Sequence, residues 1–97
     1  MGSGITLEEV KAKILPVLDK HDVARASIFG SVARDEGDET SDVDILVELR
    51  GEKSLLDLAG LKIELEEILG MGVDILTYDS LHPLLKDRIL DEQKVIL

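Results

Sequence analysis

Hydrophobic positions along this 97-residue chain change their spacing several times, and each spacing predicts a different element. The first set recurs at helical intervals and comprises Leu7, Val10, Ile14, Leu15 and Leu18. It follows Thr6-Leu7-Glu8-Glu9, where the Thr6 hydroxyl can accept from the Glu9 amide while Glu9 reaches back, as in a capping box. We therefore predict a first helix from Leu7 to about His21-Asp22. Pro16 lies inside it and should kink the helix or end its regular part, because proline has no amide hydrogen to donate.

Three short apolar runs predict strands, at Ala24–Phe29, Val43–Leu49 and Val73–Tyr78. The middle run is the strongest strand signal in the chain. Gly30-Ser31 ends the first run, and one helical turn over residues 31–34 can follow it. The polar, glycine-containing stretch from residue 35 to residue 41 is a predicted loop.

Two further helices are predicted after the middle strand. Ser54 can cap the first of them, and Gly70 and Gly72 stop it. Its expected buried stripe is Leu55, Leu58, Leu61, Leu65 and either Ile68 or Leu69. Asp79-Ser80 can cap the last helix, with Pro83 in its first turn, where proline is tolerated. The expected buried stripe of this last helix is Leu84, Leu85, Ile89 and Leu90.

The predicted order is helix, strand, helical turn, strand, helix, strand, helix, which is an α+β arrangement with an α/β-like part. The helix after Ser54 connects two strands, and such a right-handed crossover makes them parallel neighbours or near neighbours. No linker interrupts the pattern, so residues 1–97 form a single domain. Residues 1–4 are expected to be flexible.

Composition narrows the class of protein. Apolar residues make up 44% of the chain, with one Phe, one Tyr and no Trp, so an aliphatic core is expected. The absence of cysteine excludes disulfides and thiolate metal sites. No run approaches the roughly 18 apolar residues of a membrane span, and no secretion leader is visible, so a cytoplasmic location is the default expectation. The formal net charge of −10 argues against direct binding of nucleic acid. A nucleotide would need a cation to mediate its binding, and a protein partner is expected to be basic.

The acidic residues carry the chemistry. Asp42 and Asp44 lie two apart on a predicted strand, so their carboxylates share one face about 7 Å apart. Val43-Asp44-Ile45-Leu46 recurs as Val73-Asp74-Ile75-Leu76 in a second strand. If the two strands are parallel and in register, Asp74 lies beside Asp44. Three carboxylates on one face are typical ligands for one or two Mg²⁺ ions.

Gly30-Ser31 adds a candidate phosphate site. Glycine lets a phosphate approach the backbone, and the amides that open the following turn, with the Ser31 hydroxyl, can donate to phosphate oxygens. Arg34 can neutralise phosphate charge or can be an ordinary surface cation. Taken singly, Asp-x-Asp is usually an exposed strand face, and Gly-Ser is usually a turn. The combination instead favours phosphoryl or nucleotidyl transfer with two metal ions, in which Asp74 can also take the proton of an acceptor hydroxyl.

Residues 29–36, Phe-Gly-Ser-Val-Ala-Arg-Asp-Glu, are followed by residues 41–48, Ser-Asp-Val-Asp-Ile-Leu-Val-Glu. This pair of motifs resembles the minimal nucleotidyltransferase (MNT) family of the DNA polymerase β-like superfamily, and the likeness extends over nearly the whole chain. The resemblance implies a small mixed β-sheet flanked by helices, the nucleotidyltransferase fold. It also implies that Asp42, Asp44 and Asp74 bind metal and that Gly30-Ser31 binds a triphosphate. Family members often pair, as antitoxins, with a small helical HEPN-type toxin, and some transfer AMP from ATP to a toxin tyrosine.

One residue departs from the family pattern. Asp35 stands where the family usually has glycine, which adds negative charge and removes backbone freedom near the phosphate loop, although Gly37 can serve instead. Two functions compete on this basis: a Mg²⁺-dependent adenylyltransferase acting on a partner toxin, and a non-catalytic antitoxin that neutralises its partner by binding. A transferase for a small molecule or an RNA end is a weaker third idea. Homo-oligomerisation is also compatible with the sequence.

Overall fold

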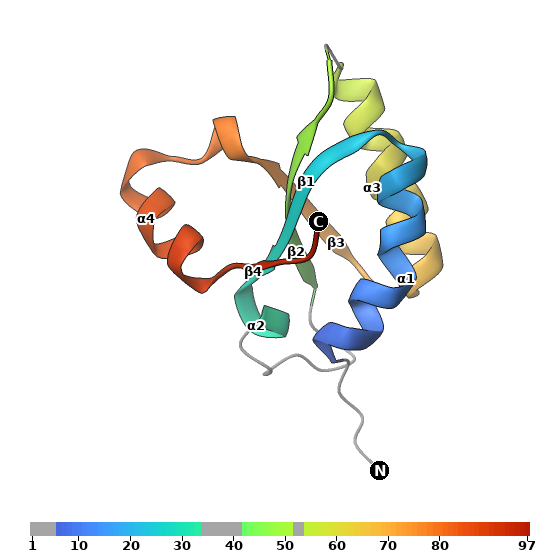
Figure 1. Ribbon diagram of the computed structural model, residues 1–97, viewed down its shortest axis with the longest axis horizontal. Helices are drawn as coiled ribbons and strands as arrows, with labels where there is room; N and C mark the ends of the chain where they lie inside the picture. Colours follow the sequence, from blue (N-terminus) through green and yellow to red (C-terminus); the bar gives the residue numbers. More distant parts are fainter. Residues whose placement is uncertain (1–5, 34–41, 52–53) are drawn as a thin grey trace.

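The computed structural model describes residues 6–33, 42–51 and 54–97, with the Ser31 side chain left aside. A four-stranded sheet lies at its centre, in the order β3-β2-β1-β4. Helices α1 and α3 lie on one side of this sheet, and α4 projects on the other (Figure 1). The elements are α1 (Leu7–Lys20), β1 (Val23–Phe29), α2 (Gly30–Ala33), β2 (Val43–Leu49), α3 (Leu55–Leu69), β3 (Val73–Thr77), η1 (Tyr78–Ser80), α4 (Pro83–Glu92) and β4 (Lys94–Val95).

The sheet is mixed. β1 runs antiparallel to both β2 and β4, whereas β2 and β3 are parallel. The parallel pair is joined by α3, so the predicted crossover and the predicted α+β fold are both confirmed. The repeated tetrapeptides pair residue for residue, with Val43 opposite Val73 and Asp44 opposite Asp74. The register that the sequence repeat suggested is therefore the register of the fold.

The core lies between the sheet and the α1/α3 layer. Val43, Ile45 and Val47 alternate along β2 and are fully buried on this face. The other buried apolar side chains of the core cluster are Val10, Ile14, Val17, Leu18, Val23, Ala26, Ile28, Val32, Ala33, Leu61, Leu65, Leu69, Val73 and Ile96. No aromatic residue is among them, so the prediction of an aliphatic core is confirmed.

Helix α1 begins as predicted, with the Glu9 amide donating to the Thr6 hydroxyl oxygen at 3.2 Å. It does not end at Pro16 but continues to Lys20. The burial of Val17 and Leu18 after the proline explains this, because tertiary packing offsets the loss of one helical hydrogen bond.

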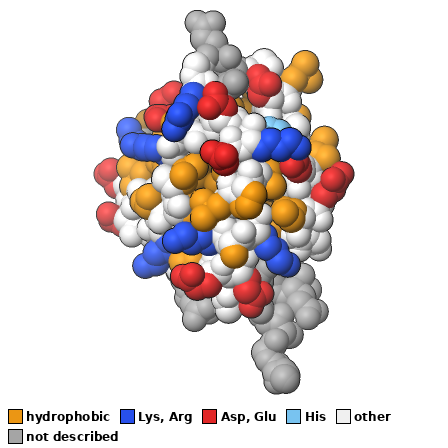
Figure 2. All heavy atoms as spheres, turned by 45° about the vertical axis from the view of Figure 1, so that its right-hand side comes forward, with side chains coloured by type: hydrophobic (Ala, Val, Ile, Leu, Met, Phe, Trp, Pro, Cys, Tyr) orange, Lys and Arg blue, Asp and Glu red, His pale blue; other side chains and the backbone are white. Residues whose placement is uncertain are grey.

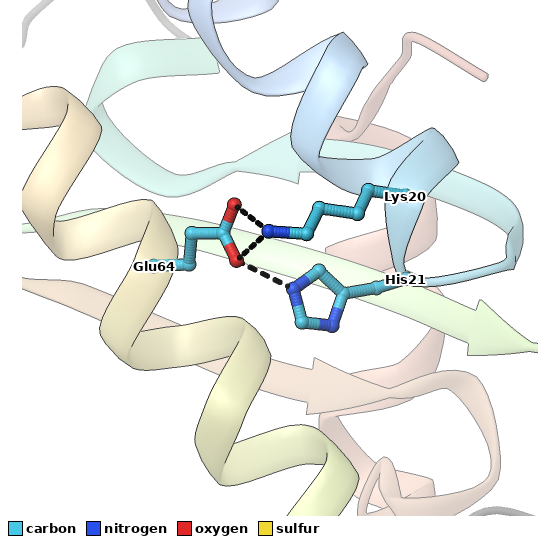
Figure 3. Close-up of polar contacts among 3 residues, drawn as sticks. All are labelled: Lys20, His21 and Glu64. Carbon is cyan, nitrogen blue, oxygen red and sulfur yellow. Dashed lines mark hydrogen bonds and ion pairs between the residues drawn. The ribbon is translucent and has the colours of Figure 1, made fainter.

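A polar contact joins the end of α1 to the middle of α3 on the rim of the core (Figure 3). The Lys20 ammonium lies 3.2 Å from both carboxylate oxygens of Glu64, and His21 Nε2 lies 3.0 Å from Oε1. The hydrogen bond to His21, followed by that to Lys20, lowers the pKa of the Glu64 carboxyl from its usual 4.5. The contact links the two helices at the rim of the core.

The C-terminal segment differs most from expectation. The predicted buried stripe of the last helix is wrong, because Leu84 is 85% exposed, Leu85 is 50% exposed and no residue of α4 is buried. The predicted cap is wrong as well: His82 caps α4, its Nδ1 accepting from the Leu84 amide at 3.1 Å, while Asp79 and Ser80 belong to η1. The reason is β4, a two-residue strand that pairs with the edge of β1 and holds the chain end there, while α4 stands away from the sheet (Figure 1).

The outward side of the helical layer also keeps apolar groups. Of the predicted α3 stripe, Leu61, Leu65 and Leu69 are buried, while Leu55 at 83% and Ile68 at 42% are exposed. Figure 2 turns this side forward and shows hydrophobic side chains gathered in its middle, with charges of both signs around them. No helix in the described ranges is long and apolar enough to cross a membrane.

Candidate active site

The face of the sheet opposite α1 and α3 carries the acidic residues that the sequence singled out. Side chains alternate along β2, so Asp44, Leu46 and Glu48 point away from the face that Val43 and Ile45 use for the core. Asp74 and Leu76 do the same on β3. We call this surface the open face. Its acidic end lies at the start of β2 and β3 and at the end of β1, which is antiparallel to β2.

Asp44 and Asp74 are direct cross-strand partners at this end. Neighbouring strands lie about 4.8 Å apart, so the two carboxylates project side by side from adjacent backbones. Asp44 is half-buried, whereas Asp74 is exposed. Two negative charges at this separation repel each other unless a cation lies near both, so the pair suits a ligand of positive charge.

Gly30 lies directly against Asp44. It follows Phe29, the β1 partner of Asp44, and opens α2 with a φ of +73°, a conformation that favours glycine. The position that a Cβ of Gly30 would take is filled by the Asp44 carboxylate, whose Cγ lies 3.2 Å from that point. Glycine is therefore needed here for two independent reasons. Ser31 follows within α2, while Arg34 and Asp35 lie outside the described residues.

Asp42 is exposed and lies just before β2, beside Gly72 rather than beside Asp74. The Val43 amide donates to the Gly72 carbonyl oxygen at 2.9 Å, which fixes the two chain segments together. Sequence reasoning treated Gly72 only as a stop for α3 and missed this contact. The available signal was its place directly before the second Val-Asp-Ile-Leu, opposite Asp42 in the parallel register.

The donor chemistry of these acids fits a hard divalent cation, which prefers carboxylate oxygens. Asp44 and Asp74 meet as neighbours, and Asp42 lies on the same end of the sheet. Within residues 6–33, 42–51 and 54–97, however, no three acidic or histidine side chains converge into a preformed metal cage. The fold brings the predicted ligands to one edge but does not gather them around one point.

Away from the acidic end, the open face contains a group of hydrogen-bonded side chains around Tyr78. Ser27 is fully buried, and its hydroxyl lies 2.6 Å from the Tyr78 hydroxyl, which also lies 3.3 Å from Gln93 Oε1. The Arg25 guanidinium lies 4.2 Å above the centre of the Tyr78 ring. A hollow of about 170 Å³ adjoins Tyr78, between the ends of β2 and β3 and the start of α3. This hollow is remote from Asp44 along β2, so it is not part of the acidic site.

Known proteins resemble this chain over nearly its whole length. Residues 10–96 match the family described as the nucleotidyltransferase domain. A relative from Methanocaldococcus jannaschii named "Putative protein adenylyltransferase" is 63% identical over 96% of this chain and 100% of its own length. A relative from Thermococcus cleftensis named protein adenylyltransferase MntA is 35% identical, over 91% of this chain and 93% of its own.

Solved structures share the same arrangement. A protein described as a "putative minimal nucleotidyltransferase" superposes with a TM-score of 0.80 at 40% identity, over 96% of this chain and 98% of the other. A toxin–antitoxin structure with AMP-PNP gives a TM-score of 0.78 at 21% identity, over 90% and 72% of the two chains. The MNT antitoxin complex with a tri-AMPylated HEPN toxin from Shewanella oneidensis gives 0.72 at 20%, over 93% and 71%. At these lower identities the likeness shows the fold alone.

Proposed function

Because this chain belongs to the nucleotidyltransferase domain family, in its minimal branch, we propose that it is a Mg²⁺-dependent protein adenylyltransferase. In this proposal it transfers AMP from ATP to a tyrosine hydroxyl of a small helical HEPN-type toxin and so acts as the antitoxin. The observation that carries the proposal is the in-register pair Asp44 and Asp74, with Gly30 directly against Asp44. A strand face with only a structural role would need neither the paired acids nor the glycine beside them.

The proposal gives each residue a role. Asp42, Asp44 and Asp74 would hold one or two Mg²⁺ ions. The bound cation would supply positive charge to the triphosphate and make the acceptor hydroxyl more acidic. Gly30 leaves room for the nucleotide to approach the end of β1, and the backbone amides at Gly30-Ser31 donate to phosphate oxygens. Arg34, which lies outside the described residues, would add a charge-assisted contact to the phosphates.

The transfer step replaces one bond to phosphorus with another and moves one proton. The tyrosine oxygen forms a bond to the α-phosphorus of ATP while the bond from that phosphorus to the pyrophosphate oxygen breaks. Pyrophosphate leaves with the electron pair. Asp74, which is exposed at the edge of the acidic site, takes the hydroxyl proton.

The net charge and the similarity to known proteins support a protein as the acceptor. The formal net charge of −10 disfavours the phosphate backbone of a nucleic acid and favours a basic partner surface. Relatives at 63% and 35% identity carry the name protein adenylyltransferase, which supports ATP as the nucleotide. The fold neighbours include a toxin–antitoxin structure and an MNT antitoxin in complex with a HEPN toxin, which supports the choice of partner.

The test is label transfer from α-³²P-ATP, with Mg²⁺, to a cognate small helical HEPN-type protein. We expect Asp44→Asn to lower the transfer rate at least about 100-fold, since loss of a metal ligand removes several kcal/mol of transition-state stabilisation. Glu48→Gln is the matched control, because Glu48 is exposed on the same face of β2. Tight Mg²⁺-ATP binding by the wild type without any transfer to this protein would overturn the catalytic proposal.

A second candidate is a non-catalytic antitoxin that neutralises the toxin by occlusion. It is favoured by the lack, in the described part of the chain, of three converging metal-binding side chains, and by Asp35 in place of the usual glycine. The two candidates separate in a toxin-neutralisation assay. An Asp42→Asn/Asp44→Asn double variant neutralises the toxin if occlusion suffices, and fails to do so if transfer is required.

A further inference from the structure

We propose that Gly72 is a positioning residue for Asp42: its missing side chain creates the place in which the Asp42 carboxylate lies at the acidic end of the open face. The inference rests on the proposed function, in which Asp42 helps to hold a divalent cation. Gly72 directly precedes β3, and the family signature of Gly-Ser, Asp-x-Asp and a third acid does not include it.

The contact between the two residues is direct. The point where a Cβ of Gly72 would lie overlaps the Asp42 carboxylate, with Asp42 Cγ at 3.2 Å and Oδ2 at 3.8 Å. A real Cβ cannot occupy that point unless Asp42 moves. Val43 N donates to Gly72 O at 2.9 Å, and Val43 pairs with Val73, so the backbones on both sides of the contact are fixed by the sheet.

The cross-strand pattern explains why glycine is found here. Asp42-Val43-Asp44 runs beside Gly72-Val73-Asp74, and alternation puts the first and third residue of each segment at the open face. Four positions therefore meet at this end of the sheet, three of them carboxylates. A fourth side chain would occupy the room that Asp42 uses.

Backbone conformation does not account for Gly72. Among the glycines of the described ranges, positive φ values occur at Gly30, Gly51 and Gly70, and not at Gly72. Any residue can therefore adopt the Gly72 backbone, and the requirement is one of space alone. This separates Gly72 from Gly30, where a substitution would combine a collision with backbone strain. An alanine at position 72 isolates the steric effect.

The substitution should move Asp42 without unfolding the protein. The atoms that a new methyl group meets are the far end of an exposed side chain, which can rotate away towards solvent. Rotation relieves the overlap but removes the carboxylate from its place over Gly72 at the acidic end of the open face. Metal affinity should fall while thermal stability stays close to that of the wild type.

The experiment measures Mn²⁺ affinity by calorimetry for the wild type, Gly72→Ala and Gly60→Ala. Gly60 is the control, because it lies in α3 with open space around its missing Cβ and without a positive φ. We expect Gly72→Ala to weaken Mn²⁺ binding about tenfold, the lower end of the effect of groups that orient a metal ligand. Gly60→Ala should bind Mn²⁺ like the wild type.

A double-mutant cycle makes the test specific. In an Asp42→Ala background there is no carboxylate to displace, so Gly72→Ala should cause no further loss of Mn²⁺ affinity. Equal losses with and without Asp42 would overturn the proposal, and so would an unchanged affinity in Gly72→Ala alone.

A second readout keeps this inference apart from the proposed function. The side-chain carboxyl ¹³C shift of Asp42 reports its surroundings without any metal, and it should change in Gly72→Ala but not in Gly60→Ala. An unchanged shift in Gly72→Ala overturns the positioning role. A changed shift in a protein whose wild type binds no Mn²⁺ supports the positioning role and overturns the proposed metal-dependent function instead.

Discussion

The two faces of β2 differ in chemistry, because one face is apolar and the other carries two acidic residues. Val43, Ile45 and Val47 are fully buried against α1 and α3, while Asp44 and Glu48 project from the open face. Asp44 is thus held between Val43 and Ile45, the two core residues beside it in sequence. We infer from this comparison that the core face fixes where the acids lie, and we expect the acids to contribute little to the stability of the fold.

The largest expected effect comes from the core face. Ile45→Ala should destabilise the fold by about 2–5 kcal/mol, because it removes a fully buried side chain and leaves a cavity. Urea unfolding monitored by circular dichroism measures the change. Asp74→Asn, on the exposed side of the neighbouring strand, should stay within about 0.5 kcal/mol of the wild type. A comparable loss of stability in both variants would show that the open face contributes to stability as much as the core face does.

A smaller effect is expected at Ser27, a buried residue on the open face of the sheet. Tyr78→Phe removes the hydroxyl that lies 2.6 Å from that of the buried Ser27, and should cost about 1–3 kcal/mol in the free energy of unfolding. Denaturant titration measures the loss. Adding Ser27→Ala should restore part of the stability, because the buried hydroxyl left without its Tyr78 partner is then removed. If the two losses simply add, the hydroxyl pair is not the cause.

The smallest expected effect lies at the rim of the helical layer. Hydrogen bonds from His21 and Lys20 lower the pKa of Glu64 from 4.5, so the folded state holds the carboxylate more strongly than the unfolded chain does. This stabilisation is complete above pH 4.5 and is lost as the pH falls through the lowered pKa. The stability difference between the wild type and Glu64→Gln should therefore shrink on acidification below pH 4.5. Thermal melts across that range test it, with Glu67→Gln, exposed on the same helix, as the control.

Features that depend on local pattern could be predicted from the sequence. The strand Val43–Leu49 has the bounds that alternation suggested, and the repeated Val-Asp-Ile-Leu correctly placed Asp44 opposite Asp74. Thr6 caps α1 as its capping box indicated. The metal-binding and phosphate-binding roles of these residues remain predictions, and Arg34 lies outside the described residues.

Features that depend on distant partners could not be predicted. The two residues of β4 are too few to show a period, and only the free edge of β1 makes them a strand. Without β4, the apolar stripe of α4 was assigned to a core that it never reaches. Gly72 was visible as a helix stop, but its contact with Asp42 exists only once β2 and β3 are paired.

The way α4 is attached has a dynamic consequence. The segment from Tyr78 to Val95 is held by the hydroxyl contacts of Tyr78, by the short pairing of β4 and by contacts of α4 with α2, and no residue of α4 is buried. Such a segment can open as a unit while the pairing of β1, β2 and β3 stays intact, because local opening needs only these few contacts to break. Amide hydrogens of α4 should exchange with solvent well before those of β2. Transient release of this segment would uncover Ser27 and the edge of β1, and it would also remove the contacts of α4 with α2, the helical turn that begins at Gly30.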